Sequence, residues 1–154
     1  MNKNFMKTFG TMAIALTFCL TMLFISSTSF AQRLVDNGNG TVTDTQTRLM
    51  WTKNADPFWS LTWDDAMSKC SSYSISGISG WRMPSSDELV ALSDAIKGGH
   101  PFTRVQGSYY WSSSESTIST IITDHTRVVV IYNGFVNLKS KSNTYPVWPV
   151  RFVR

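Results

Sequence analysis

Asn-Gly pairs near both ends of the chain limit what this sequence can fold into more than any other feature. Asn37-Gly38 and Asn39-Gly40 lie among alternating apolar and polar residues, and Asn133-Gly134 separates two apolar runs. Such pairs supply the positive φ angles that tight antiparallel hairpin turns require. The sequence therefore predicts an opening β-hairpin, a short strand ending at Met50-Trp51, and a second hairpin within Arg127–Ser140.

Two segments between these hairpins are predicted to be helices. In the first, residues 61–73, Thr62 is a suitable N-cap, and apolar residues recur at helical spacing: Trp63, Ala66, Met67, Cys70 and Tyr73. The second starts with the pattern S-x-x-E at Ser85 and Glu88, a capping box, and ends at Gly98-Gly99. Ahead of it, Arg82 can hold carbonyl or carboxylate oxygens near the turn. With further strands expected at 108–114 and 147–154, the fold class is α+β.

Residues 1–31 have the features of a signal peptide. Lys3 and Lys7 precede an apolar stretch too short for a comfortable membrane span, and Ser29 and Ala31 fit a small-x-small cleavage pattern. We expect cleavage before Gln32 and export to the periplasm or the outside of a bacterium, with no stable membrane span afterwards. An uncleaved signal anchor is the alternative. About 120 residues remain, enough for the single domain expected over residues 32–154.

The basic residues are unevenly distributed. Loss of Lys3 and Lys7 would reduce the formal charge from +4 to +2. Beyond Ile96 the acidic residues are only Glu115 and Asp124, while the basic ones are Lys97, Arg104, Arg127, Lys139, Lys141, Arg151 and Arg154. This second half is a candidate surface for anions. The alternative is that these charges are spread over several faces and only maintain solubility.

Cys70 would be the only cysteine after cleavage, so an intramolecular disulfide is not possible. An odd thiol in an exported protein is either buried or available for pairing between molecules. Because Cys70 lies on the apolar stripe of the first predicted helix, we expect it to be buried.

Sequence patterns typical of enzymes, cofactors and metals are missing. His100 and His125 have no partner at the spacing of a zinc motif, and we expect both on exposed loops. The oxygen-rich segment 36–44 does not have the spacing of a calcium loop. We therefore expect no catalysis, cofactor or metal. Nucleic acid is an unsuitable ligand, because the protein is exported and its basic residues are too few for a phosphate-tracking groove.

Glycans fit the composition better, because aromatic faces stack on sugar rings while Arg and Lys hold sulfate, phosphate or carboxylate groups. The candidate cations are Arg104, Arg127, Lys139 and Lys141. The candidate aromatic residues are Tyr132, Tyr145 and Trp148, followed by Trp59, Tyr109 and Phe135. The alternative for each aromatic residue is packing in the core, to which we assign Trp51, Trp63, Trp81 and Trp111.

Six segments occur in an order that resembles the bacterial family named for the C-terminal domain of the Legionella collagen-like protein: DNGNGTVTDTQTRLMW, TWDDAMSKC, GWRMPSSDEL, YYWSSS, YNGFVNLKSKS and VRFVR. The resemblance covers essentially all of residues 32–154. It implies a C-type lectin-like fold, with two helices packed on a twisted, mainly antiparallel sheet. It also implies an exported or surface-located binding domain, from a family long described as a domain of unknown function.

The chain departs from this family at two positions. Phe152 stands where relatives usually have a cysteine, so the disulfide with Cys70 that the resemblance implies is absent. Such a bond stabilises a domain by about 2–5 kcal/mol. Arg48 replaces a turn glycine, which predicts local backbone strain. The residue triplets of calcium-dependent lectins are also missing, so the resemblance does not imply calcium-dependent sugar binding.

Two functions follow as hypotheses. The first is a non-catalytic binding module for anionic glycan or another surface polyanion, acting in adhesion or in the cell envelope. The second is a protein-binding or assembly subunit of a cell-envelope complex, including a homo-oligomer, whose aromatic residues form the contact patch.

Overall fold

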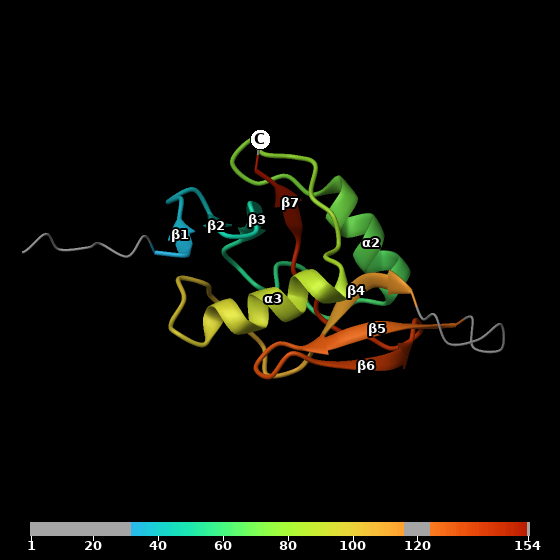
Figure 1. Cartoon of the computed structure of the whole chain (residues 1–154). Coiled ribbons are helices and arrows are strands. Elements are labelled where there is room, and N and C mark those ends of the chain that lie inside the picture. The colour runs from blue at the N-terminus through green and yellow to red at the C-terminus, as the bar shows by residue number, and fades with distance from the viewer. Residues whose placement is uncertain (1–31, 116–123, 154) are drawn as a thin grey trace, which may run out of the picture. The chain divides into compact units, whose positions relative to one another are not determined.

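The computed structural model describes residues 32–115 and 124–153, which form two helices and two antiparallel sheets. The first sheet has the order β1-β2-β3-β7 and the second the order β4-β5-β6 (Figure 1). The strands are β1 (Leu34–Asp36), β2 (Thr41–Asp44), β3 (Leu49–Thr52), β4 (Tyr109–Glu115), β5 (His125–Val130), β6 (Phe135–Ser140) and β7 (Val150–Phe152). The helices are α2 (Trp63–Ser72) and α3 (Ser86–Ile96). The α+β class is confirmed, but the expected single sheet is two sheets.

Both helices begin at the predicted caps. The Thr62 hydroxyl accepts a hydrogen bond from the Asp65 N–H at the start of α2. At α3, Ser85 Oγ accepts from the Glu88 N–H at 3.1 Å, and the Glu88 carboxylate accepts from the Ser85 N–H at 2.8 Å. The capping box is therefore complete, and these side chains satisfy backbone donors that no helical partner reaches.

The hairpins also form where the Asn-Gly pairs predict them. β1 pairs with β2 between Leu34↔Asp44 and Asp36↔Val42, and Gly38 and Gly40 in the connecting turn have φ of 73° and 83°. β5 and β6 pair from Val130↔Phe135 outward, and Gly134 has φ of 70°. In each turn, glycine takes a backbone conformation that costs other residues free energy.

The core has two parts, which lie on opposite faces of the second sheet. Val129 of β5 belongs to the part under α3, and Val128 belongs to the part that includes Ala66 and Cys70 of α2. Helix α3 contacts β4 and β5, and α2 contacts β4 (Figure 1). Because side chains alternate along a strand, neighbouring residues of β5 such as these two face different parts of the core.

Several residues differ from the sequence-based expectations. Met67 of α2 is exposed, and Trp63 is only half-buried, so the predicted core stripe is narrower than its periodicity suggested. The last strand, expected over 147–154, is shorter in the structure and consists of β7 alone. Residues 147–149 are buried in the core but lie outside any strand. Arg48 has φ of 57°, as the loss of a turn glycine predicted.

None of the described helices is long and apolar enough to cross a membrane. The predicted signal peptide, residues 1–31, lies outside the described residues.

Candidate functional site

Both candidate lysines lie over aromatic rings. Lys139 Nζ is 4.9 Å from the centre of the Tyr109 ring, and Lys141 Nζ is 4.1 Å from the centre of a Trp63 ring. The Tyr145 ring touches Tyr109 edge to face, with ring centres 5.5 Å apart. We call these five residues, Trp63, Tyr109, Lys139, Lys141 and Tyr145, the lysine–aromatic face.

Strand register brings the first of these pairs together. Lys139 of β6 lies opposite Thr126 of β5, while Tyr109 of β4 lies opposite Val130. Thr126 and Val130 are an even number of residues apart on one strand, so Lys139 and Tyr109 project from the same face of the sheet. The Asn137 amide donates to the Tyr109 hydroxyl at 3.3 Å and holds the ring in this position.

Backbone contacts between α2 and the end of β6 position the second pair. The Trp63 N–H donates to the Lys141 carbonyl at 3.1 Å, and the Trp63 indole N–H donates to the Ser112 carbonyl at 2.9 Å. Trp63 is therefore held at both its backbone and its ring. The Lys141 side chain starts beside Trp63, and its ammonium lies over the indole ring.

The two ammonium groups are ordered but not neutralised by the described residues. Neither Lys139 nor Lys141 forms an ion pair with any carboxylate in residues 32–115 or 124–153. The Asp124 carboxylate, which the pairing of β5 with β6 brings near these lysines, accepts from Ser140 Oγ at 2.6 Å. Contact with a ring face stabilises an exposed ammonium by about 0.5–1 kcal/mol without cancelling its charge. The face thus presents positive charge in a restricted position.

The other candidate cations lie elsewhere. Arg127 pairs with Leu138 in β5–β6, so its side chain leaves the sheet on the opposite face from Lys139. Arg104 lies over the Trp59 ring, with the guanidinium carbon 4.1 Å from a ring centre. The basic residues therefore converge in part: two lysines share a face, and these two arginines do not join them.

The candidate aromatic residues also separate. Tyr145 belongs to the lysine–aromatic face. Tyr132 is exposed, and its hydroxyl donates to the Val105 carbonyl at 3.4 Å. Trp148 has no exposed surface, and its indole N–H donates to the Thr52 carbonyl at 2.9 Å. A ligand cannot touch a completely buried ring, so we correct the expectation for Trp148 and assign it to the core.

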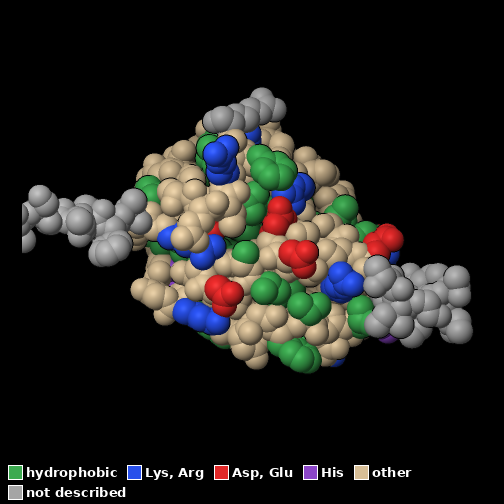
Figure 2. All heavy atoms as spheres, in the orientation of Figure 1, with side chains coloured by type: hydrophobic (Ala, Val, Ile, Leu, Met, Phe, Trp, Pro, Cys, Tyr) green, Lys and Arg blue, Asp and Glu red, His purple; other side chains and the backbone are tan. Residues whose placement is uncertain are grey.

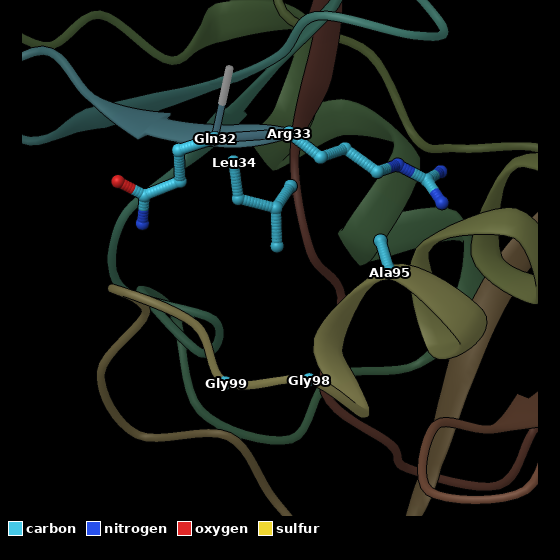
Figure 3. Close-up of a pocket in the computed structure, with 6 residues that line it drawn as sticks. All are labelled: Gln32, Arg33, Leu34, Ala95, Gly98 and Gly99. Atoms are coloured by element: carbon cyan, nitrogen blue, oxygen red, sulfur yellow. The ribbon is translucent and has the colours of Figure 1, made fainter. Parts of the chain in front are cut away.

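Other parts of the surface offer less to a charged ligand. On the face shown in Figure 2, Lys and Arg side chains lie apart from one another and among Asp and Glu side chains. A hollow of about 240 Å³ lies between Arg33–Leu34 and Gly98-Gly99 (Figure 3). Leu34 points into it, whereas Arg33 extends toward α3. The Arg33 guanidinium donates to the Asp44 carboxylate of β2 at 2.9–3.0 Å. This arginine is already paired, and the hollow offers no open charge.

Within the described residues, no three His, Cys, Asp or Glu side chains lie close enough to hold a metal ion. Burial raises the pKa of the Cys70 thiol to about 12, and the residue has no exposed surface, which confirms its predicted burial. His125 begins β5 and is half-buried, so it is not the exposed loop residue we expected. His100 is exposed, as predicted.

The order of motifs and the described fold agree with a comparison against protein families. Residues 40–151 match the Lcl C-terminal domain. The chain belongs to the Lcl C-terminal domain family. The match spans both sheets and both helices, from the end of the first hairpin turn to the last strand. No protein with a curated description matches the chain.

In this Lcl C-terminal domain, sequence reasoning missed the role of Trp63 and underrated that of Tyr109. Trp63 lies on the apolar stripe of α2, and nothing in that pattern shows that Lys141 covers it. Tyr109 was a secondary candidate, and only the fold shows that this residue, opposite Val130 of β5, contacts Lys139 and Asn137 of β6. A hollow beside Asp56 was missed entirely, because its residues come from three separate segments.

Proposed function

We propose that this Lcl C-terminal domain is an exported, non-catalytic binding module whose lysine–aromatic face binds anionic glycan or another surface polyanion. The observation that carries the proposal is the pair Lys139 and Lys141, each held over an aromatic ring without a carboxylate partner among the described residues. A role in adhesion or in the cell envelope fits this ligand class, and cleavage of residues 1–31 would deliver the domain to the periplasm or the cell surface.

The ring contacts favour binding because they reduce the motion that a ligand must arrest. A free lysine loses up to about 2 kcal/mol of side-chain entropy when it is fixed. Lys139 and Lys141 have already lost part of that freedom in contacts with Tyr109 and Trp63. A sulfate or carboxylate group that binds either ammonium therefore gains attraction at a reduced entropic cost.

Retention on immobilised sulfated polysaccharide, compared with retention on a sulfonate cation exchanger, tests this function. If the lysines form an arranged site, the purified protein elutes from the polysaccharide at clearly higher salt than from the exchanger. Elution at the same low salt from both columns contradicts the proposal, because it shows only the general attraction of a weakly basic protein.

A second candidate function is supported by a different surface. Tyr132, Phe135 and Val136 are exposed around the β5–β6 turn, and β6 is an edge strand of its sheet. Exposed aromatic residues beside an unpaired strand edge are typical of protein contacts. This patch suits an assembly subunit of a cell-envelope complex or a homo-oligomer. A monomer at all concentrations in light scattering would contradict the homo-oligomer.

A further inference from the structure

A hollow of about 310 Å³ lies next to the lysine–aromatic face. Its lining residues are Asp56, Trp59, Ser60, Gln106, Ser108 and Pro146, and we call it the Asp56 hollow. Ser108 precedes Tyr109 and Pro146 follows Tyr145 in the chain. Two residues that line the hollow are therefore direct chain neighbours of residues in the lysine–aromatic face. None of its lining residues belongs to that face.

The backbone around the hollow is held on both sides. The Ala55 N–H donates to the Thr103 carbonyl, and the Thr103 N–H donates to the Lys53 carbonyl, both at 2.9 Å. The segment before Asp56 is therefore paired with Thr103. The segment after Trp59 is paired through Leu61 and Tyr145, which exchange two hydrogen bonds of 3.0 and 3.1 Å. The three segments that line the hollow are therefore fixed relative to one another.

Two residues beside the hollow have backbone conformations that side chains disfavour. Trp59 has φ of 65° and Arg104 has φ of 55°. For residues other than glycine, this region is sterically unfavourable. The geometry leaves 67% of the Trp59 surface exposed and places Arg104 over the indole at 4.1 Å. A strained loop that displays a large aromatic side chain is typical of binding sites.

Asp56 gives the hollow a buried carboxylate that can accept a hydrogen bond. Its side chain lines the hollow, only 5% of the residue is exposed, and Oδ1 has no hydrogen-bond partner among the described residues. Burial raises the pKa of the Asp56 carboxyl, although Arg104 and the Trp59 N–H act in the opposite direction. A buried acceptor without a partner destabilises the protein, and a ligand that donates a hydrogen bond to it would recover that free energy.

The charges near the hollow select an uncharged ligand. The Asp56 carboxylate and the Arg104 guanidinium have opposite charges that offset each other, so neither an anion nor a cation gains a net attraction there. Ser60, Ser108 and Gln106 add polar groups to the lining. The volume equals that of about ten water molecules in the liquid, enough for a single six-membered sugar ring partly sunk in the surface.

We propose that the Asp56 hollow binds one uncharged sugar ring, whose hydroxyl groups donate hydrogen bonds to Asp56 while its C–H face lies against Trp59. Arg104 covers one face of the indole, so the sugar contacts the other. This site is independent of the lysine–aromatic face, since it recognises hydroxyl groups and not anionic ones. A polysaccharide that contains both kinds of group would occupy both sites.

The test is titration of ¹⁵N-labelled protein with four neutral sugars, glucose, galactose, mannose and N-acetylglucosamine, each followed by NMR. We expect at least one sugar to give saturable shifts in the Trp59 indole N–H and in the amides of Gln106 and Ser108. No saturable shift with any of the four overturns the proposal. Saturable shifts confined to the lysine–aromatic face overturn it as well.

Two variants and two controls complete the test. In Trp59→Ala, we expect binding of the responding sugar to be about tenfold weaker, which corresponds to ~1.4 kcal/mol. Asp56→Asn should weaken it severalfold, with the wild-type spectrum otherwise retained. Phe135→Ala, which removes another exposed aromatic ring, should bind as wild type. The double variant Lys139→Gln/Lys141→Gln should also bind the neutral sugar as wild type. Unchanged sugar affinity in both Trp59→Ala and Asp56→Asn contradicts the site.

Discussion

The two terminal guanidinium nitrogens of Arg82 donate to both carboxylate oxygens of Glu88, at distances of 2.8 and 2.6 Å. The same carboxylate accepts from the Ser85 N–H at 2.8 Å. Glu88 thus joins the chain before α3 to the first turn of the helix. The Arg82 backbone exchanges hydrogen bonds with Val150, so the contact also ties α3 to the last strand.

Replacing Glu88 with Gln should destabilise the protein by about 1–3 kcal/mol, the usual effect of removing one partner from a charged, partly buried hydrogen bond. Burial favours the neutral form of Glu88, but hydrogen bonds from Arg82 and Ser85 outweigh it and lower the pKa below its ordinary 4.5. A lowered folded-state pKa stabilises the protein above pH 4.5, and that stabilisation is lost as pH falls through the folded value.

Urea unfolding of wild type and Glu88→Gln at pH 7 and at pH 3 would check this prediction. The difference in unfolding free energy should be largest at pH 7 and should shrink at the lower pH. A difference that is the same at both values would show that Glu88 acts only through packing. Asp87→Asn, a neighbouring carboxylate in the same helical turn, is the matched control.

Arg48 provides a second prediction, because its φ of 57° suits glycine better than any other residue. Arg48→Gly should be more stable than Arg48→Ala by about 1 kcal/mol, since only alanine keeps the steric cost of a Cβ atom there. Comparing these two variants with each other removes the effect of the lost charge. Thermal unfolding of both variants would measure this difference in stability. An alanine variant as stable as the glycine variant would contradict the prediction.

Cys70 should be inert in the folded protein. It has no exposed surface, and burial raises its pKa to about 12, so almost no thiolate is present at pH 8. A protein that begins at Gln32, in which Cys70 is the only thiol, should not react with iodoacetamide at pH 8 on the timescale of minutes. In urea it should react completely, as mass spectrometry would show. Rapid labelling of the native protein would mean that α2 opens readily.

Sequence reasoning located the elements whose signals are local. The capping box at Ser85 and Glu88 and the turn at Asn133-Gly134 depend on residues a few positions apart, so both were predicted with their partners. The two separate sheets were not predicted, because strand order depends on contacts between distant segments. Trp148 was named as a ligand candidate but is fully buried, and Trp63 was assigned to the core but is only half-buried against it, since burial of an aromatic ring depends on its tertiary neighbours.

The positions of the basic residues were only partly predictable. A hairpin at Asn133-Gly134 already implies that Arg127 and Lys139 leave the sheet on opposite faces, because a two-residue turn would place Lys139 opposite Val128. The observed pairing, Val130↔Phe135, shifts this register by two residues and preserves the faces. The ring beneath each lysine was not predictable, because Trp63 comes from a helix far away in the sequence.

Polyanion binding at the lysine–aromatic face depends most directly on Lys139 and Lys141, and one comparison tests it. Lys139→Gln/Lys141→Gln and the control Lys53→Gln/Lys97→Gln lose the same charge. The control lysines, however, already bind Asp36 and Asp94 at 2.7 and 2.6 Å. Each variant would be eluted from immobilised sulfated polysaccharide with a salt gradient, after thermal unfolding has shown that it is folded. We predict that Lys139→Gln/Lys141→Gln elutes at clearly lower salt than wild type, while the control shifts only slightly. Equal shifts in the two variants would contradict a site at the lysine–aromatic face.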